Sequence, residues 1–193
     1  MSEPAKKKAT YEDLYDIPEN TIGEIIDGKL IVHPRPSRKH IHTSSVLGGK
    51  LNPSYQLGSG GPGGWIILDE PEVQLGEHTV VPDLAGWKRE RFPVEEETNS
   101  ISVAPDWVCE ILSPSTIRTD KIQKMGIYAR HAVDHFWLID PIAMTMDVFK
   151  LGDSKWVLLG SFAENDNVRA EPFQEVEFNL GDLWIGSSPP AAT

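Results

Sequence analysis

The chain of 193 residues carries 18 Lys and Arg against 29 Asp and Glu, which gives a formal net charge of −11. Hydrophobic residues make up 39% and charged residues 24%. This globular composition excludes wholesale disorder, collagen and a coiled coil, and the acidity excludes a general nucleic-acid coat protein. The acid is concentrated in residues 51–100 (3 basic, 9 acidic) and 151–193 (2 basic, 7 acidic). The rest is nearly neutral, so a local site for an anion remains open.

The expected organisation is a flexible N-terminus (residues 1–9), one domain (residues 10–186) and a flexible tail (residues 187–193). A single cysteine, Cys109, cannot form an intramolecular disulfide, which fits a reducing cytoplasm. No apolar run follows the lysines near the N-terminus, and no stretch approaches the ~20 apolar residues of a membrane helix. We therefore expect a cytoplasmic protein without a membrane partner.

In chain order, the first expected element is a short helix that Thr10 caps and that ends before Pro18. Residues 24–32 then predict a β-hairpin, because Asp27-Gly28 is a typical two-residue hairpin turn.

Ser37 opens a helical pattern that two glycines, Gly48 and Gly49, weaken. The inner side of this helix is expected to carry Ile41, Ser45, Leu47 and Leu51. A flexible glycine-rich connection at residues 58–64 follows the helix.

The second half of the chain alternates apolar and polar segments. The expected strands are residues 65–68, 72–75, 79–87, 107–112 and 136–139, followed by two or three antiparallel strands between residues 144 and 178. Residues 88–105 read as a long surface loop with acidic residues 95–97 at its centre. Residues 116–131 read as a helix capped by Ser115 or Thr116. The order predicts an α+β (mixed α/β) fold, with a β-rich core and a helix on each side.

Two carboxylates stand inside apolar strands. Glu110 interrupts a Val/Cys/Ile/Leu run, where burial without a partner would be costly. It could instead face outward while its neighbours along the strand face the core. Asp83 follows Pro82 and could be a turn residue. Together, two such carboxylates could hold Mg²⁺ through oxygen ligands, and the metal would then polarise a phosphodiester and lower the pKa of a bound water.

The helix after Glu110 places Asp120, Lys124 and Tyr128 on one face, because they are four residues apart. A lysine there could stabilise negative charge that develops at a phosphate. The plainer interpretation is an exposed ion pair between Asp120 and Lys124. Lys121 is an alternative candidate lysine, or a solvated surface residue.

One basic cluster precedes and opens the first helix, and it comprises Arg35, Arg38, Lys39 and His40. These side chains could contact a DNA backbone. A solvated helix start explains the same residues equally well.

The motifs, in their order and spacing, resemble the Uma family of restriction-endonuclease-like proteins, in the PD-(D/E)xK nuclease superfamily. The resemblance covers about residues 10–185. It rests on Tyr11, residues 24–30 (EIIDGKL), Pro36, His40, residues 81–84 (VPDL), residues 105–116 (PDWVCEILSPST), Asp120, Lys124, Tyr128 and residues 133–141 (VDHFWLIDP).

The resemblance implies a restriction-endonuclease-like core, which is a mixed β-sheet flanked by helices, with extra antiparallel strands. It implies that Asp83 and Glu110 bind Mg²⁺ or Mn²⁺, with Glu24 as a third acid. The lysine of the superfamily motif should stand at Leu112 and is absent; the resemblance implies that Lys124 takes its place.

The resemblance therefore implies a metal-dependent endonuclease that acts on DNA. The possible phosphate contacts are Arg38, Lys39, His40 and Lys121. A catalytically inactive binding or assembly module of the same fold is the alternative, and a hydrolase of a small phosphorylated molecule is a third. A homodimer would make cleavage of both strands easier.

Overall fold

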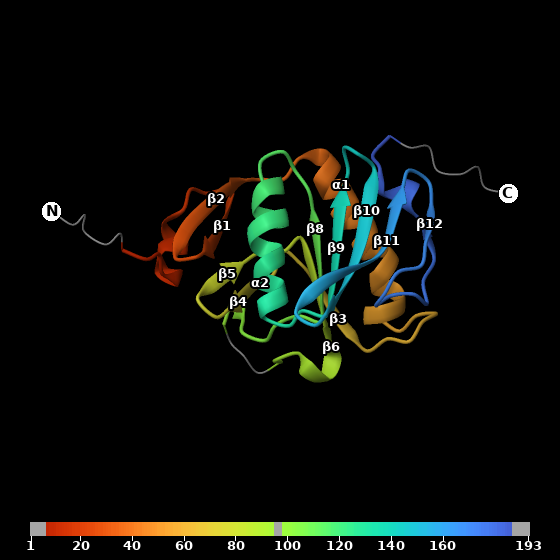
Figure 1. Ribbon diagram of the computed structural model, residues 1–193, viewed down its shortest axis with the longest axis horizontal. Coiled ribbons are helices and arrows are strands. Elements are labelled where there is room, and N and C mark those ends of the chain that lie inside the picture. Colours follow the sequence, from red (N-terminus) through yellow and green to blue (C-terminus); the bar gives the residue numbers. More distant parts are fainter. Residues whose placement is uncertain (1–6, 95–97, 187–193) are drawn as a thin grey trace.

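The computed structural model describes residues 7–94 and 98–186, and its strands form three sheets (Figure 1). The largest sheet contains, in spatial order, β11 (Lys155–Ala163), β10 (Thr145–Gly152), β9 (His135–Asp140), β8 (Trp107–Ile111), β6 (Leu84–Lys88) and β3 (Trp65–Asp69). The second contains β2 (Lys29–Pro34), β1 (Thr21–Ile26), β5 (His78–Val80), β4 (Glu72–Leu75) and β7 (Ser100–Ile101). The third pairs β12 (Asn167–Val168) with β13 (Phe178–Asn179).

Helical segments are few in the described part of the chain. The α-helices are α1 (Arg38–Leu51) and α2 (Met125–Arg130). Short 3-10 helices form η1 (Tyr11–Asp16), η3 (Arg89–Arg91) and η5 (Leu180–Leu183). π-helical turns form η2 (Asn52–Gln56), which continues α1, and η4 (Thr119–Lys124), which leads into α2. None of these described helices is long and apolar enough to cross a membrane.

The six-stranded sheet is mixed, because β8 and β9 run parallel and its other neighbouring strands run antiparallel. One face packs against Leu47 and Leu51 of α1, and the other against Ile127 and Tyr128 of α2. Figure 1 shows the two helices on opposite sides of this sheet. The predicted α+β fold, with a helix on each side of a β-rich core, is confirmed.

The predicted hairpin is present between β1 and β2. Ile26 pairs with Lys29, and Asp27 and Gly28 between them have φ of 51° and 68°. Positive φ at both central residues is the geometry of a type I′ turn, whose twist matches the flanking strands. This turn fixes the register of the hairpin, and that register places a site residue described below.

The inner side predicted for α1 is wrong in two positions. Ile41 is 53% exposed and Ser45 is also exposed, whereas Leu47 and Leu51 are buried as expected. The buried face begins instead at His40 and Thr43. Polar contacts cause the shift: His40 contacts Asp83, and the Thr43 hydroxyl donates a hydrogen bond to a backbone carbonyl of η5. The periodicity of apolar residues cannot predict polar contacts of this kind.

The single strand predicted at residues 79–87 is two strands, β5 and β6, which belong to different sheets. The interruption falls at residues 81–83. Pro82 has no N–H for a ladder, and the N–H of Val81 donates to the Glu24 carboxylate at 2.8 Å rather than to a strand. The chain therefore leaves one sheet and enters the other at Asp83.

The helix predicted at residues 116–131 begins differently from expectation. The Ser113 hydroxyl, rather than that of Ser115 or Thr116, accepts a hydrogen bond at the start of this segment, from the backbone N–H of Thr116 at 3.3 Å. The predicted loop at residues 88–105 contains η3 and β7, while its acidic centre, residues 95–97, lies outside the described residues. So do residues 1–6 and the predicted tail, residues 187–193.

Candidate active site

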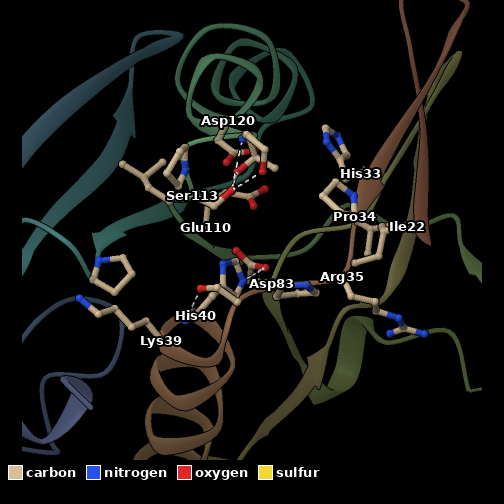
Figure 2. A pocket seen from close by; sticks show the side chains of 18 of the residues that line it. Ile22, His33, Pro34, Arg35, Lys39, His40, Asp83, Glu110, Ser113 and Asp120 are labelled. Carbon is tan, nitrogen blue, oxygen red and sulfur yellow. Dashed lines mark hydrogen bonds and ion pairs between the residues drawn. The ribbon is translucent and has the colours of Figure 1, made fainter. Parts of the chain in front are cut away.

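The strand break at Asp83 opens onto a cavity of about 330 Å³ between the two larger sheets, the start of α1 and the segment leading into α2. All four residues that the sequence proposed for catalysis line it: Glu24, Asp83, Glu110 and Lys124. Figure 2 shows Asp83 and Glu110 close together at its centre, with Asp120 on the helix side. We call this space the carboxylate cavity.

The ammonium of Lys124 is the centre of the charged network. It lies 2.8 Å from Glu110 Oε1, 2.9 Å from Glu24 Oε1 and 3.0 Å from the carbonyl oxygen of Val81. An ammonium has three N–H donors, so every one has an acceptor here. Burial lowers the pKa of Lys124, but the carboxylates outweigh it and hold this pKa well above its usual value. Lys124 is therefore a buried cation, and the interpretation as an exposed ion pair is wrong.

Glu24 reaches Lys124 from strand β1. Its Oε1 also accepts the N–H of Val81, and its Oε2 lies 3.2 Å from His33 Nε2. Burial would raise the pKa of Glu24, but Lys124 and these hydrogen bonds lower it to about 2. Glu24 therefore stays ionised across the physiological range, with both oxygens engaged by the protein.

Glu110 lies on β8 and is 2% exposed, so the alternative that it faces solvent is wrong. The Tyr128 hydroxyl donates to its Oε1 at 2.5 Å, beside the Lys124 contact. Burial raises the pKa of Glu110 well above its usual value, Lys124 opposes this, and nearby Asp120 and Asp83 add to the rise. An added cation would therefore be favourable at this position.

Asp83 is held from two directions. Its Oδ1 lies 2.6 Å from His40 Nε2, and its Oδ2 accepts the N–H of Ile111 at 2.5 Å. Because Ile111 follows Glu110 on β8, the second bond fixes Asp83 next to that carboxylate. Burial lowers the pKa of His40, but Asp83 outweighs it and raises this pKa above its usual value.

The residues proposed to contact phosphate divide into two groups. Lys39 and His40 line the carboxylate cavity, although the Nε2 of His40 is engaged by Asp83. Arg38 and Lys121 are exposed and are not among the lining residues. Arg35, the remaining member of the basic cluster, does line the cavity.

Two lining residues, His33 and Asp120, were not assigned to the site from the sequence. For Asp120 the signal was its spacing of four residues from Lys124, which now lies 3.9 Å away. For His33 the signal was the hairpin turn. That turn pairs Glu24 with Ile31, and His33, two residues further on, is the diagonal neighbour of Glu24 on the same face.

The carboxylate cavity holds more acid than base. Four carboxylates line it, Glu24, Asp83, Glu110 and Asp120, and the one buried cation among them is the ammonium of Lys124. The two other basic side chains of the lining, Arg35 and Lys39, are exposed. Carboxylate oxygens are the ligands that Mg²⁺ and Mn²⁺ prefer, so the donor set suits such a cation. Within residues 7–94 and 98–186, however, no three His, Cys, Asp or Glu side chains are arranged as a ready metal site. Lys124 occupies the position beside Glu24 and Glu110.

Asp120 gives a pH-dependent prediction. Burial raises the pKa of Asp120 from 3.8 to about 6, so its carboxyl group binds a proton more tightly in the folded state than in the unfolded state. The ionised Asp120 therefore lowers the free energy of unfolding. This loss of stability is absent below about pH 4 and complete above about pH 6, where it amounts to about 3 kcal/mol. We expect Asp120→Asn to raise the melting temperature at neutral pH and to leave it nearly unchanged near pH 4. Thermal unfolding across this range would contradict the account if the variant were less stable at neutral pH.

Two comparisons with known proteins found matches, one to a family model and one to a solved structure. A family model described as "Putative restriction endonuclease", Uma2, matches residues 9–181. A solved structure titled as "a putative nuclease belonging to DUF820" from Anabaena variabilis ATCC 29413 is 28% identical, with a TM-score of 0.74. That similarity covers 91% of this chain and 97% of the Anabaena chain. None of the curated proteins compared with this chain matches it.

Proposed function

Because the chain belongs to the Uma2 restriction-endonuclease family, we propose that it is a divalent-metal-dependent nuclease that hydrolyses DNA phosphodiester bonds. The observation that carries this proposal is the meeting of Glu24, Asp83, Glu110 and Lys124 in one cavity. These residues come from strands β1 and β8, from the connection between β5 and β6, and from the helical turn η4, far apart in sequence. The excess of carboxylates over buried cations around them further supports a site for a metal ion.

In this proposal, Asp83 and Glu110 would hold Mg²⁺ or Mn²⁺. Leu84 of β6 pairs with Cys109 of the antiparallel strand β8. Asp83 directly precedes Leu84 and Glu110 directly follows Cys109, so the two acids lie beside each other. The metal would polarise a phosphoryl oxygen and lower the pKa of a bound water. Glu24 has both oxygens bound by protein groups, so its role in the proposal is to hold the Lys124 ammonium beside Glu110.

Lys124 would take the role of the lysine that is missing at Leu112. Leu112 and Lys124 line the same cavity, and the ammonium is within hydrogen-bond distance of Glu110. Since all three of its N–H groups have acceptors, Lys124 must release one of them to donate to a phosphate. Its charge would then stabilise the transition state of the phosphoryl group.

The alternative is a non-catalytic module of the same fold. One observation favours it: among the described residues, the acids are satisfied by Lys124, His33, His40 and Tyr128 rather than grouped as three ready ligands. A closed ion network of this kind could persist after loss of catalysis. Direct assay of cleavage decides between the two functions.

The decisive assay uses covalently closed circular DNA, because only an endonuclease can open it. Single-stranded circles and supercoiled duplex circles are incubated with purified protein and Mg²⁺ or Mn²⁺. We expect linear products from the single-stranded circles and nicked or linear products from the duplex circles, with no product in the presence of EDTA and none with Asp83→Asn under any condition. Absence of cleavage of both circles by wild-type protein, with either metal, would exclude the nuclease function and favour the non-catalytic module.

The homodimer expected from the sequence remains a prediction. Its best candidate surface is the exposed edge strand β11, where three consecutive apolar residues are about half exposed: Val157, Leu158 and Leu159. Long apolar edge strands in soluble proteins are usually covered. Sedimentation velocity at micromolar concentration tests this prediction, and a monomer would contradict it.

A further inference from the structure

The acids of the carboxylate cavity are recessed, and this limits what can reach them. Glu24, Glu110 and Lys124 are each 2% exposed. A phosphodiester that reacts there must enter the cavity, whose volume of about 330 Å³ lies at the small end of the range for ligand pockets. The phosphates of a duplex lie along both edges of a stiff rod with a persistence length of about 50 nm. Deep entry of one duplex phosphate would therefore require the strand around it to leave the helix.

Apolar side chains from several segments contribute to the walls of the cavity. Pro34 and Pro36 line it from the end of β2 and the segment before α1, and Pro114, Pro141 and Ile142 line it from the segments that follow β8 and β9. Ile142 is 60% exposed although it is a large apolar residue. Such a wall suits the flat face of an unpaired base, and proteins use proline and isoleucine to separate stacked bases in DNA.

The turn that presents Ile142 is held in shape by the protein. Asp140 Oδ1 accepts the backbone N–H groups of Ile142 and Ala143, both at 2.9 Å. The turn joins β9 to β10, two neighbouring strands that each pair on both sides in the six-stranded sheet. Ile142 is therefore a fixed apolar projection at the lip of the cavity rather than a side chain on a loose loop.

The cations near the opening are few. Arg35 and Lys39 are the exposed basic residues among those that line the cavity. In Figure 2 they extend on opposite sides of His40. Proteins that grip duplex DNA commonly neutralise about 6–10 phosphates. Two flanking cations on a chain of net charge −11 instead match the few phosphates of a short single strand.

From these features we propose that the preferred substrate is unpaired DNA: a single strand, a loop or a frayed end. The scissile phosphate would enter the carboxylate cavity, the neighbouring base would pack against Ile142, and Arg35 and Lys39 would contact the flanking phosphates. Water adds to phosphorus, the bond to the leaving oxygen breaks, and that oxygen takes up the proton. This inference rests on the proposed nuclease function and adds its substrate class.

The test compares one labelled oligonucleotide alone, annealed to its complement, and placed in the loop of a hairpin, with Mn²⁺ present. We expect the single strand and the loop to be cleaved at least about tenfold faster than the duplex, because extracting a paired nucleotide costs a few kcal/mol. Equal or faster cleavage of the duplex overturns this inference and leaves the nuclease function standing. Cleavage of none of the three overturns both.

A variant at the cavity lip gives a second readout. Ile142→Asp should raise KM for the single strand about tenfold, because it removes the base contact and adds a charge that repels phosphate. Ile142→Trp should lower KM, since an indole stacks on bases better than an isoleucine does. Ile122→Asp, at an exposed isoleucine outside the cavity lining, is the matched control and should change neither KM nor kcat. An unchanged KM in both Ile142 variants would overturn the proposed base contact.

Discussion

Replacement of Glu110 by glutamine is expected to reduce metal-dependent DNA cleavage by a factor of about 10³ or more. Glutamine keeps the shape of the side chain and can still accept from Tyr128 or Lys124. It removes the negative charge that would hold the metal beside Asp83. The loss of several kcal/mol of transition-state stabilisation corresponds to this factor. Single-turnover cleavage of a single-stranded oligonucleotide in Mn²⁺ measures it.

The matched control for Glu110→Gln is Asp106→Asn. Asp106 is a buried carboxylate with its own ion pair to Arg91 and a hydrogen bond from the Lys88 N–H, outside the carboxylate cavity. We expect this variant to lose stability and to retain cleavage at temperatures where it is folded. Equal loss of cleavage in both variants would indicate that Glu110 acts only through folding.

Replacement of Lys124 by methionine is expected to destabilise the protein by about 3–5 kcal/mol at neutral pH, because it leaves Glu24 and Glu110 buried without their cation. Without Lys124 the pKa of Glu24 rises above its value in the unfolded chain, and the pKa of Glu110, which burial already raises, rises further. The folded variant then binds protons more readily, so its stability should rise as the pH falls toward 5. Mn²⁺ should also stabilise the variant, and more than it stabilises the wild type, because the metal replaces the lost charge.

In the wild type, the contribution of Glu24 to stability should respond to acid in the opposite direction. The pKa of Glu24 is about 2, below its unfolded value, so its contribution is present above about pH 4.5 and is lost as the pH falls toward 2. Lys121→Met, at an exposed lysine three residues from Lys124, is the control and should change stability by less than about 0.5 kcal/mol. Thermal unfolding from pH 2 to 8, with and without Mn²⁺, measures the wild type and both variants. A Lys124→Met protein as stable as wild type in EDTA at neutral pH would contradict the charge network.

Much of the fold follows from local sequence. The Asp27-Gly28 turn sets the register of the first hairpin, and the apolar runs predict the central strands β8 and β9. The break between β5 and β6 was missed because residues 79–87 are apolar on both sides of Pro82 and read as one strand. Its cause is a contact between Val81 and Glu24, which are 57 positions apart. No local pattern contains such a contact.

The site was predictable where residues lie inside apolar segments or keep helical spacing. Glu110 and Asp83 met the first condition, and Asp120 and Lys124 met the second. The contacts of these residues could not be predicted from the sequence. All three N–H groups of Lys124 have acceptors, and His40 contacts Asp83. These contacts join segments from β1, α1, β8 and the helix. They depend on the packing of whole elements, which a single sequence does not specify at atomic detail.

The central claim is that the carboxylates of one cavity hold a catalytic divalent cation, and Mn²⁺ titration followed by electron paramagnetic resonance tests it most directly. Free Mn²⁺ gives a strong signal that binding removes, so bound metal is counted without any assay of activity. The account predicts saturable binding by the wild type, its loss in Asp83→Asn and in Glu110→Gln, and its retention in Glu70→Gln, which alters a carboxylate outside the carboxylate cavity. Binding that is absent in the wild type, or unchanged in the Asp83 and Glu110 variants, would contradict the account.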